Sequence, residues 1–270
     1  MKVLCDTVTM VGCKRYLTAL SISWKFETMD QHPELQAFYE DYYDDTVSRK
    51  REIMAQQTVD HIVSLGKNVH LGSVLDVGAG DGAVLAELER RELGAELHAV
   101  EISSSGIERI NRRNLKRLKS VQGFDGYKLP FPDDSFDTAL LVHVLEHVEH
   151  ERLLLKEIRR VARRCYIEVP LEHTMRLGRS ISIGKSFGHI NFYTIKTFEN
   201  ILDTARLSPV AVATFSASLD YERHLSGPVL GAIKHAVRSS ALEINSSVAA
   251  QLFVYMAGAL CERKEGILLQ

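Results

Sequence analysis

Short apolar runs alternate with longer segments of helical pattern from residue 73 onward. The runs have the length of strands, and they are almost continuously apolar, as parallel strands buried on both faces are. The expected strands are Ser73–Val77, Leu97–Ile102, Ser120–Asp125, Phe136–Val142 and Cys165–Val169, with helices at Ala83–Leu93, Ser104–Lys119 and Glu149–Arg164. This alternation predicts an α/β fold in which helices cover a mostly parallel sheet.

The segments on either side of this repeat do not follow it. Before it, a helical pattern covers Ser48–Leu65, and we expect a helical cap or lid over residues 1–70. After it come a Gly/Ser/Arg-rich loop, a helix from about Thr194, a strand-like run, a helix and a final apolar run. The loop is Leu177–Gly188 and the strand-like run is Pro209–Phe215. The second helix is Val229–Ile244, and the final apolar run is Leu252–Leu260. The predicted core spans 71–218, a helical insertion 219–248, and the last strand of the core 249–270.

Composition and charge are those of an ordinary globular protein. The chain has 270 residues, 45% of them hydrophobic, and its 33 Lys and Arg nearly balance its 35 Asp and Glu. No global charge therefore favours nucleic acid or anionic membranes. The longest uncharged stretch, Ile244–Leu260, is short for a bilayer span, and we expect it in the core. The four cysteines form no CxxC pair, which predicts a reducing cytoplasm and no disulfide framework.

The most informative stretch is the glycine loop, residues 78–82, directly after the first expected strand. Glycine occupies positions 78, 80 and 82, and a helix is predicted to begin at Ala83. Such a turn brings bare backbone and the N–H groups of a helix N-terminus close to a ligand. Gly78-x-Gly80-x-x-Ala83 also satisfies the dinucleotide-binding pattern. The loop alone therefore indicates a nucleotide-type ligand, which can be a dinucleotide or another adenosine compound.

Two carboxylates separate the possible ligands. Asp76 lies inside the end of the first expected strand, where a buried carboxylate needs a cationic or hydrogen-bonding partner. Glu101 lies near the end of the next strand, where it can accept hydrogen bonds from ribose hydroxyls. An α-amino acid joined to adenosine would use both carboxylates.

Several further motifs follow in a fixed order. They are Asp76-x-Gly78-x-Gly80-x-Gly82, Glu101, Asp125-Gly126, Leu129-Pro130-Phe131 with Phe136-Asp137, and His143-Val144-Leu145-Glu146-His147. Together they resemble the class I S-adenosylmethionine-dependent methyltransferases, in the branch that acts on quinones, lipids and natural products. The resemblance runs from about Ser73 to Pro170. It implies a Rossmann-like, doubly wound sheet of seven strands with an antiparallel last strand, and helical cap elements.

The resemblance also implies roles at the methionine end of the cofactor. Gly78, Gly80 and Gly82 would line the methionine moiety and the nearby ribose. Asp76 would anchor the loop or the amino group of the ligand. His143, just past the fourth strand, would lie near the methionine carboxylate or the sulfonium.

At the adenosine end, the resemblance assigns Glu101 to the ribose hydroxyls and Ile102 to the face of the adenine. Asp125 would accept a hydrogen bond from the adenine amino group, with the Gly126 N–H beside it; a plain turn role for Asp125 is the alternative. Tyr43, in an acidic and aromatic stretch over 38–45, is a candidate to close over the cofactor.

Histidines supply the candidates for proton transfer. His189 is the first and His147 the second candidate for a general base, with a structural role as the alternative for each. His143-x-x-Glu146-His147 formally matches an inverted zinc-protease motif. Because it directly follows a buried strand within a cofactor-binding series, we expect no metal there.

A run of basic residues recurs at helical spacing over Arg109–Lys119. We expect a solvated basic helix face, and contact with an anionic partner is the alternative. No aromatic residues are interleaved, which argues against RNA.

The sequence thus predicts a methyltransferase that uses S-adenosylmethionine and acts on a small or medium-sized acceptor, such as a natural product, sugar, lipid or quinone. The chemistry requires in-line placement of nucleophile, methyl carbon and sulfur, with water excluded. A non-catalytic cofactor-binding regulator and a nicotinamide-dependent oxidoreductase are the alternatives. We expect no nucleic-acid partner and no membrane span, and a homodimer is left open.

Overall fold

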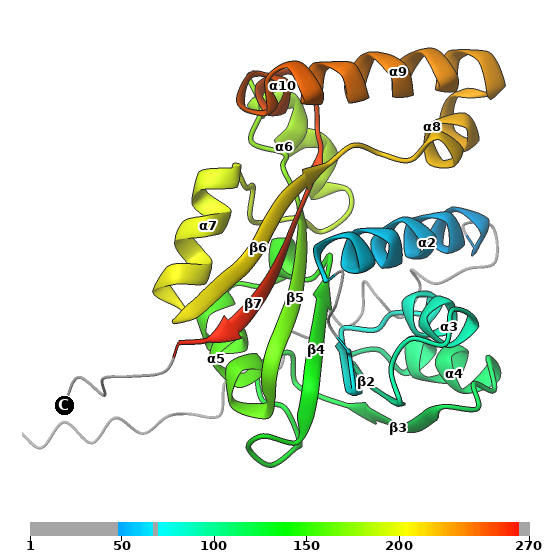
Figure 1. The fold of residues 1–270 in the computed structure, drawn as a ribbon, viewed down its shortest axis with the longest axis vertical. Helices are drawn as coiled ribbons and strands as arrows, with labels where there is room; N and C mark the ends of the chain where they lie inside the picture. The colour runs from blue at the N-terminus through cyan, green and yellow to red at the C-terminus, as the bar shows by residue number, and fades with distance from the viewer. Residues whose placement is uncertain (1–47, 67–69, 265–270) are drawn as a thin grey trace, which may run out of the picture. The chain divides into compact units, whose positions relative to one another are not determined.

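One mixed sheet forms the centre of the protein (Figure 1). The computed structural model describes residues 48–66 and 70–264, and in this part of the chain seven strands pair in the order β3-β2-β1-β4-β5-β7-β6. Their bounds are β1 Ser73–Val77, β2 Glu96–Glu101, β3 Leu118–Gly123, β4 Phe136–Val142, β5 Ala162–Pro170, β6 Leu207–Phe215 and β7 Met256–Arg263.

The strand directions confirm the predicted topology. β1 pairs in parallel with β2 and β4, and parallel pairing continues from β2 to β3 and from β4 to β5. β7 is antiparallel to both β5 and β6. The chain winds outward from β1 in one direction and from β4 in the other. The carboxyl ends of β1 and β4 therefore border the crevice in which open α/β sheets bind ligands.

Helices cover both faces of the sheet. The bounds of those packed on it are α2 Ser48–Leu65, α3 Ala83–Arg90, α4 Ser104–Arg112, α5 Glu151–Val161 and α7 Ile195–Thr204. One buried cluster joins α5 and α7 to the strands, and the other joins α2, α3 and α4 to the opposite face. Side chains alternate accordingly along β4, where Ala139 and Leu141 belong to the first cluster and Leu140 to the second.

Four further helices lie beyond the carboxyl ends of the parallel strands, at the top of Figure 1. They are α6 Leu177–Lys185, α8 Leu219–Ser226, α9 Pro228–Ile244 and α10 Ser246–Leu252. The predicted insertion over 219–248 thus contains α8 and α9, while α10 extends past it.

The helix predicted over Ser104–Lys119 begins at the expected residue, but the prediction is wrong beyond Arg112. α4 ends at Arg112 because Asn114 adopts a left-handed φ of 50°, a common way for a helix to stop. The basic residues beyond it take separate roles: Arg113 pairs with Asp81, and Arg117 donates to the Gly94 carbonyl. The expected continuous basic face does not exist.

The loop predicted over Leu177–Gly188 is also wrong in large part, because residues 177–185 form α6. The glycine at its end has a packing role: a Cβ on Gly184 would lie 2.8 Å from the Phe192 ring. The absence of a side chain there permits close contact, which the sequence pattern does not distinguish from a turn.

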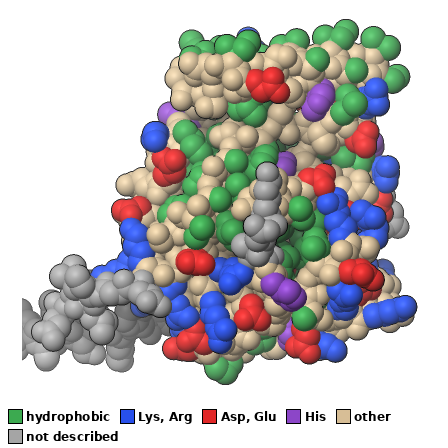
Figure 2. Space-filling view, viewed as in Figure 1, with side chains coloured by type: hydrophobic (Ala, Val, Ile, Leu, Met, Phe, Trp, Pro, Cys, Tyr) green, Lys and Arg blue, Asp and Glu red, His purple; other side chains and the backbone are tan. Residues whose placement is uncertain are grey.

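The expectation that Ile244–Leu260 is core holds only for its second half. Ala257 and Ala259 are buried in β7, but the Ile244 residue is 85% exposed, and Val248 and Leu252 are half exposed. Apolar side chains also gather on α9 along the upper edge of Figure 2, among them Val229 and Ile233. Among the described helices, none combines the length and apolar character that crossing a bilayer requires.

Candidate functional site

A cleft of about 360 Å³ lies at the carboxyl ends of β1 and β4. The glycine loop and Asp76 form one wall, and α2 contributes Lys50, Met54 and Thr58. The opposite wall contains Glu146, His147 and His189 from segments that follow β4 and α6. The structure therefore brings together Asp76, Gly78, Gly80, His143, His147 and His189 from the predicted site.

The backbone of the glycine loop requires glycine at its first position. Gly78 has a φ of +72°, and a Cβ there would lie 2.7 Å from Val144 Cγ2. The N–H groups of Gly78 and Ala79 donate to the Val100 carbonyl at 2.9 and 3.1 Å, which ties the loop to β2. The result is a rigid, bare turn that faces the cleft.

Asp76 is the most unusual residue of this wall. It is 2% exposed and lines the cleft, and its Oδ2 has no hydrogen-bond partner among the described residues. Burial, together with the nearby Glu101 carboxylate, raises the pKa of Asp76 to about 7. A buried carboxylate of this kind is stabilised when a cation or donor binds beside it.

Glu101 lies behind the loop rather than on the surface of the cleft. Its Oε2 accepts from the Gly80 N–H at 2.9 Å, and its Oε1 accepts from the N–H and hydroxyl of Ser103. Burial raises the pKa of Glu101, although these hydrogen bonds oppose the shift. In this structure Glu101 fixes the loop against the start of α4, and its contact with ribose stays a prediction.

Gly82, predicted with the other two loop glycines for the methionine moiety and the nearby ribose, does not line the cleft and has a φ of 75° at the N-cap of α3. The residues predicted for the adenosine end do not line it either, and Ile102 lies past β2. Asp125 is exposed, and its Oδ1 accepts from two following backbone N–H groups, a turn arrangement that Gly126 shares with a φ of 88°. Tyr43 lies outside the described residues.

His143 is held in a strained and charged state. Its φ of 54° is rare for a side chain larger than glycine. Its Nδ1 donates to Glu146 Oε1 at 3.2 Å, and its Nε2 lies 3.3 Å from Glu168 Oε1. Burial alone would lower the pKa of His143, but these two hydrogen bonds raise it to about 10. An imidazolium therefore lines the same cleft as Asp76.

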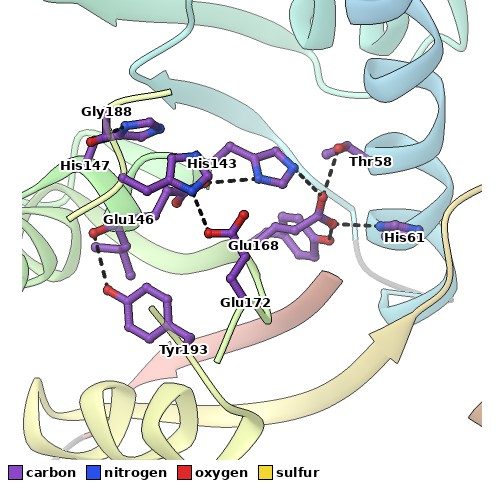
Figure 3. Close-up of polar contacts among 12 residues, drawn as sticks. Thr58, His61, His143, Glu146, His147, Glu168, Glu172, Gly188 and Tyr193 are labelled. Carbon is purple, nitrogen blue, oxygen red and sulfur yellow. Dashed lines mark hydrogen bonds and ion pairs between the residues drawn. The ribbon is translucent and has the colours of Figure 1, made fainter. Parts of the chain in front are cut away.

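Glu168, on β5, is a functional candidate that the sequence reasoning missed. Thr58 donates to its Oε1 at 3.1 Å, His61 donates to its Oε2 at 2.7 Å, and the Tyr166 hydroxyl also donates to Oε2 (Figure 3). Burial would raise the pKa of Glu168, but the hydrogen bonds from His143 and His61 hold it well below its usual range. The carboxylate thereby links α2, β5 and the end of β4.

The opposite wall contains both histidines that the sequence selected. His147 Nδ1 donates to the Gly188 carbonyl at 3.1 Å, and His189 Nδ1 donates to Glu172 Oε2 at 2.7 Å. The two rings meet edge to face, with centroids 4.7 Å apart. Burial lowers the pKa of His147, which favours the neutral ring at pH 7.

Residues 1–70 were expected to form a cap or lid, but no individual residue of α2 was predicted for the site. Lys50 Nζ lies 5.7 Å from the centroid of the Phe187 ring, and burial lowers the pKa of this lysine. Arg51 Nε donates to Asp81 Oδ2 at 2.8 Å and fixes the helix over the glycine loop. A helical pattern alone gives no sign that these residues face a ligand cleft.

Residues 75–164 match a family model described as a methyltransferase domain. The chain contains a methyltransferase domain. It is 35% identical over 121 residues to the malonyl-[acyl-carrier protein] O-methyltransferase of Halorhodospira halophila, covering 44% of this chain and 40% of that protein. It is also 35% identical over 104 residues to the fatty-acid O-methyltransferase of Mycolicibacterium smegmatis, covering 38% of each. The chain thus spans less than half the length of these two relatives. Other relatives have the names of sterol, quinone and phospholipid methyltransferases.

Solved structures show that the fold extends beyond the matched segment. A geranyl diphosphate methyltransferase in complex with SAM superposes with a TM-score of 0.58 over 79% of this chain and 85% of that chain, at 18% identity. The Rossmann-like methyltransferase fold that the sequence predicted for the methyltransferase domain is therefore confirmed.

Proposed function

We propose that this protein uses S-adenosylmethionine to methylate a small or medium-sized acceptor in the cleft. The observation that carries the proposal is the buried Asp76 oxygen, which has no partner within residues 48–66 and 70–264 and lines one cleft with a bare glycine turn at the switch point of the sheet. This combination fits a ligand that has an ammonium group attached to an adenosine.

The residues present fit the methionine end of that cofactor. Asp76 would accept from the ammonium group, and the glycine loop leaves room where a side chain would collide. The His143 imidazolium would attract the carboxylate, because the two glutamates that hold it keep it charged. The proposal also includes the adenosine end of the cofactor. There Glu101 would bind the ribose hydroxyls, Ile102 would pack on the adenine, and Asp125 with Gly126 would contact the adenine amino group.

The acceptor would bind in the remaining part of the cleft, between the N-terminal half of α2 and the wall that contains His147 and His189. Bound cofactor supplies a methyl group on a sulfonium, which leaves as a neutral thioether. The protein then has to align the acceptor with that methyl group and exclude water, and Tyr221 of α8 and Phe187, just after α6, line this cleft. The curated relatives methylate varied lipid and quinone molecules by their names, which supports an acceptor of that size.

Calorimetry with S-adenosylhomocysteine tests this proposal. We expect one binding site per chain, and no comparable binding of NADH, because a buried carboxylate at position 76 repels a pyrophosphate. No heat of binding at millimolar S-adenosylhomocysteine would overturn the proposal. Methyl transfer from S-adenosylmethionine to a panel of carboxylate, phenol and quinone acceptors then separates an enzyme from a regulator that only binds cofactor.

A further inference from the structure

Three potential metal ligands converge on the acceptor side of the cleft. One ligand atom from each of Glu146, His147 and His189 lies within 4.8 Å of the other two. We propose that these residues bind a divalent transition-metal ion. The proposal differs from the expectation drawn from the sequence, which considered His143, Glu146 and His147 and expected no metal; here the third ligand is His189, from the loop after α6.

The unsatisfied oxygen of Glu146 points to a missing ligand. Glu146 is 1% exposed, and its Oε2 has no hydrogen-bond partner within the described residues. Its other oxygen, Oε1, accepts from His143 Nδ1. Leaving a buried carboxylate oxygen without a partner is costly, and a bound cation would remove that cost.

Both histidines are oriented as metal ligands usually are. A ligating histidine commonly donates its second ring N–H to a carbonyl or carboxylate, which fixes the ring and its tautomer. His147 donates from Nδ1 to the Gly188 carbonyl, and His189 donates from Nδ1 to the Glu172 carboxylate. In each ring Nε2 is then the nitrogen that can ligate a metal.

The two segments that supply the ligands are clamped together. The N–H groups of Ile190 and Asn191 donate to the Glu146 carbonyl at 2.7 and 3.0 Å. The Asn191 side chain donates to the carbonyls of Leu145 and Val148 at 2.9 and 2.7 Å. Ligands in a tetrahedral zinc site are about 3.3 Å apart, so binding of an ion would require the three ligand atoms to move only a short distance towards one another.

Two imidazoles and one carboxylate favour a particular class of metal. This donor set suits Zn²⁺, Fe²⁺ or Co²⁺ rather than Ca²⁺ or Mg²⁺, which prefer oxygen ligands. Three protein ligands leave at least one coordination position for another group. Because the three side chains line the cleft, that position faces the space in which the acceptor would bind.

The role of the ion rests on the proposed function. An acceptor hydroxyl or carboxyl oxygen would bind the metal, which lowers the pKa of the acceptor, and the released proton would pass to water. The oxygen then forms a bond to the methyl carbon as the carbon–sulfur bond breaks, and the electron pair remains on sulfur. His189 would act as a metal ligand in this scheme, in place of the general base that the sequence suggested.

Titration of the chelator-treated, full-length protein with Co²⁺ tests the site without any methyl transfer. We expect one equivalent to bind with visible absorption bands typical of a low-coordinate imidazole site, and Zn²⁺ to displace it. His189→Ala and Glu146→Gln should each weaken binding by about 100-fold, and Glu172→Gln by about tenfold. His224→Ala, at an exposed position on α8, is the matched control and should bind as the wild type does.

Two results would overturn the proposal: no binding at millimolar Co²⁺ or Zn²⁺, or binding that survives the His189→Ala and Glu172→Gln substitutions. Titration of S-adenosylhomocysteine into His189→Ala and Glu172→Gln verifies that these two variants are folded. Glu146→Gln is left out of this check, because Glu146 also holds the His143 imidazolium. The titration separates this proposal from the proposed function, because the proposed cofactor contacts involve neither His189 nor Glu172. If cofactor binds and metal does not, only the metal site fails.

Discussion

The two walls of the cleft each contain a buried carboxylate with one oxygen that finds no partner in the described part of the chain, but their surroundings are opposite. Asp76 lies beside glycine backbone and Glu101, and burial raises its pKa to about 7. Glu146 lies among His143, His147 and His189; burial would raise its pKa, but these groups lower it. The first wall therefore suits a ligand that brings its own positive charge. In the second wall a carboxylate lies among imidazole rings, two of which are the metal ligands that we propose.

The walls also differ in how the chain builds them. The wall around Asp76 comes from a continuous stretch, with a strand, a turn and a helix in succession. The wall around Glu146 is assembled from the 3-10 helix Leu145–His147, the loop after α6 and, at its base, the Glu168 network that holds α2. Its geometry depends on tertiary contacts between distant segments, so substitutions far from the ligand should disturb it.

The largest expected effect is on the contact between α2 and the sheet. Glu168→Ala removes the partner of two histidines, a threonine and a tyrosine, and leaves the His143 charge with less compensation. We expect a loss of about 3–5 kcal/mol in the free energy of unfolding, measured by urea denaturation. Glu199→Ala, in an exposed pair with Lys196, should change it by less than about 1 kcal/mol. Equal effects from the two substitutions would show that the network does not hold the helix.

The charge of Asp76 should make cofactor binding depend on pH. Only the ionised carboxylate attracts an ammonium group, and with a pKa of about 7 it becomes protonated as the pH falls. Affinity for S-adenosylhomocysteine should fall about tenfold per pH unit below 7 and level off above 8. His143 stays protonated through this range, since its pKa is about 10. Calorimetry between pH 5.5 and 8.5 checks this, and Asp76→Asn should remove the dependence.

A smaller effect is expected from the turn itself. Gly78→Ala places a side chain at a φ of +72° and against Val144, which should cost about 1–2 kcal/mol in stability and weaken cofactor binding. Gly178→Ala is the matched control, because it lies on α6 with nothing within 4 Å of the added Cβ. That control should be neutral or stabilising by about 0.5–1 kcal/mol. Thermal unfolding of both variants measures the two effects. A Gly78→Ala variant as stable as the wild type would contradict the requirement for glycine at this position of the turn.

The smallest effect should come from the apolar surface of α9. Ile233 is 56% exposed, so Ile233→Ser should change the free energy of unfolding by no more than about 0.5 kcal/mol. Ile158→Ser, at a fully buried position of α5, is the contrasting variant and should destabilise by several kcal/mol, about 3 or more. A large loss from Ile233→Ser in urea denaturation would mean that this face is covered in solution.

Sequence reasoning succeeded where neighbouring residues determine the structure. The order of strands and helices, the glycine turn and the odd position of Asp76 can all be recognised from local pattern. It failed where a single residue or a distant contact decides: Asn114 ended α4 early, and Gly184 packed inside a helix that looked like a loop. Glu168 offered the same signal as Asp76, a carboxylate inside an apolar strand, and that signal could have revealed its network. The pairing of Glu146 with His189 depends on the fold of the loop after α6, and no spacing in the sequence shows it.

A binding cycle tests the role of Asp76 most directly. It measures the affinity for S-adenosylhomocysteine and for 5′-methylthioadenosine, which lacks the amino-acid group. Both ligands are titrated into the wild type, into Asp76→Asn and into the control Asp203→Asn, at an exposed position of α7. The account predicts that the wild type and the control prefer S-adenosylhomocysteine by at least about tenfold, and that Asp76→Asn loses most of this preference while it still binds methylthioadenosine. An unchanged preference in Asp76→Asn would contradict the claim that the buried carboxylate holds the ammonium group of the cofactor.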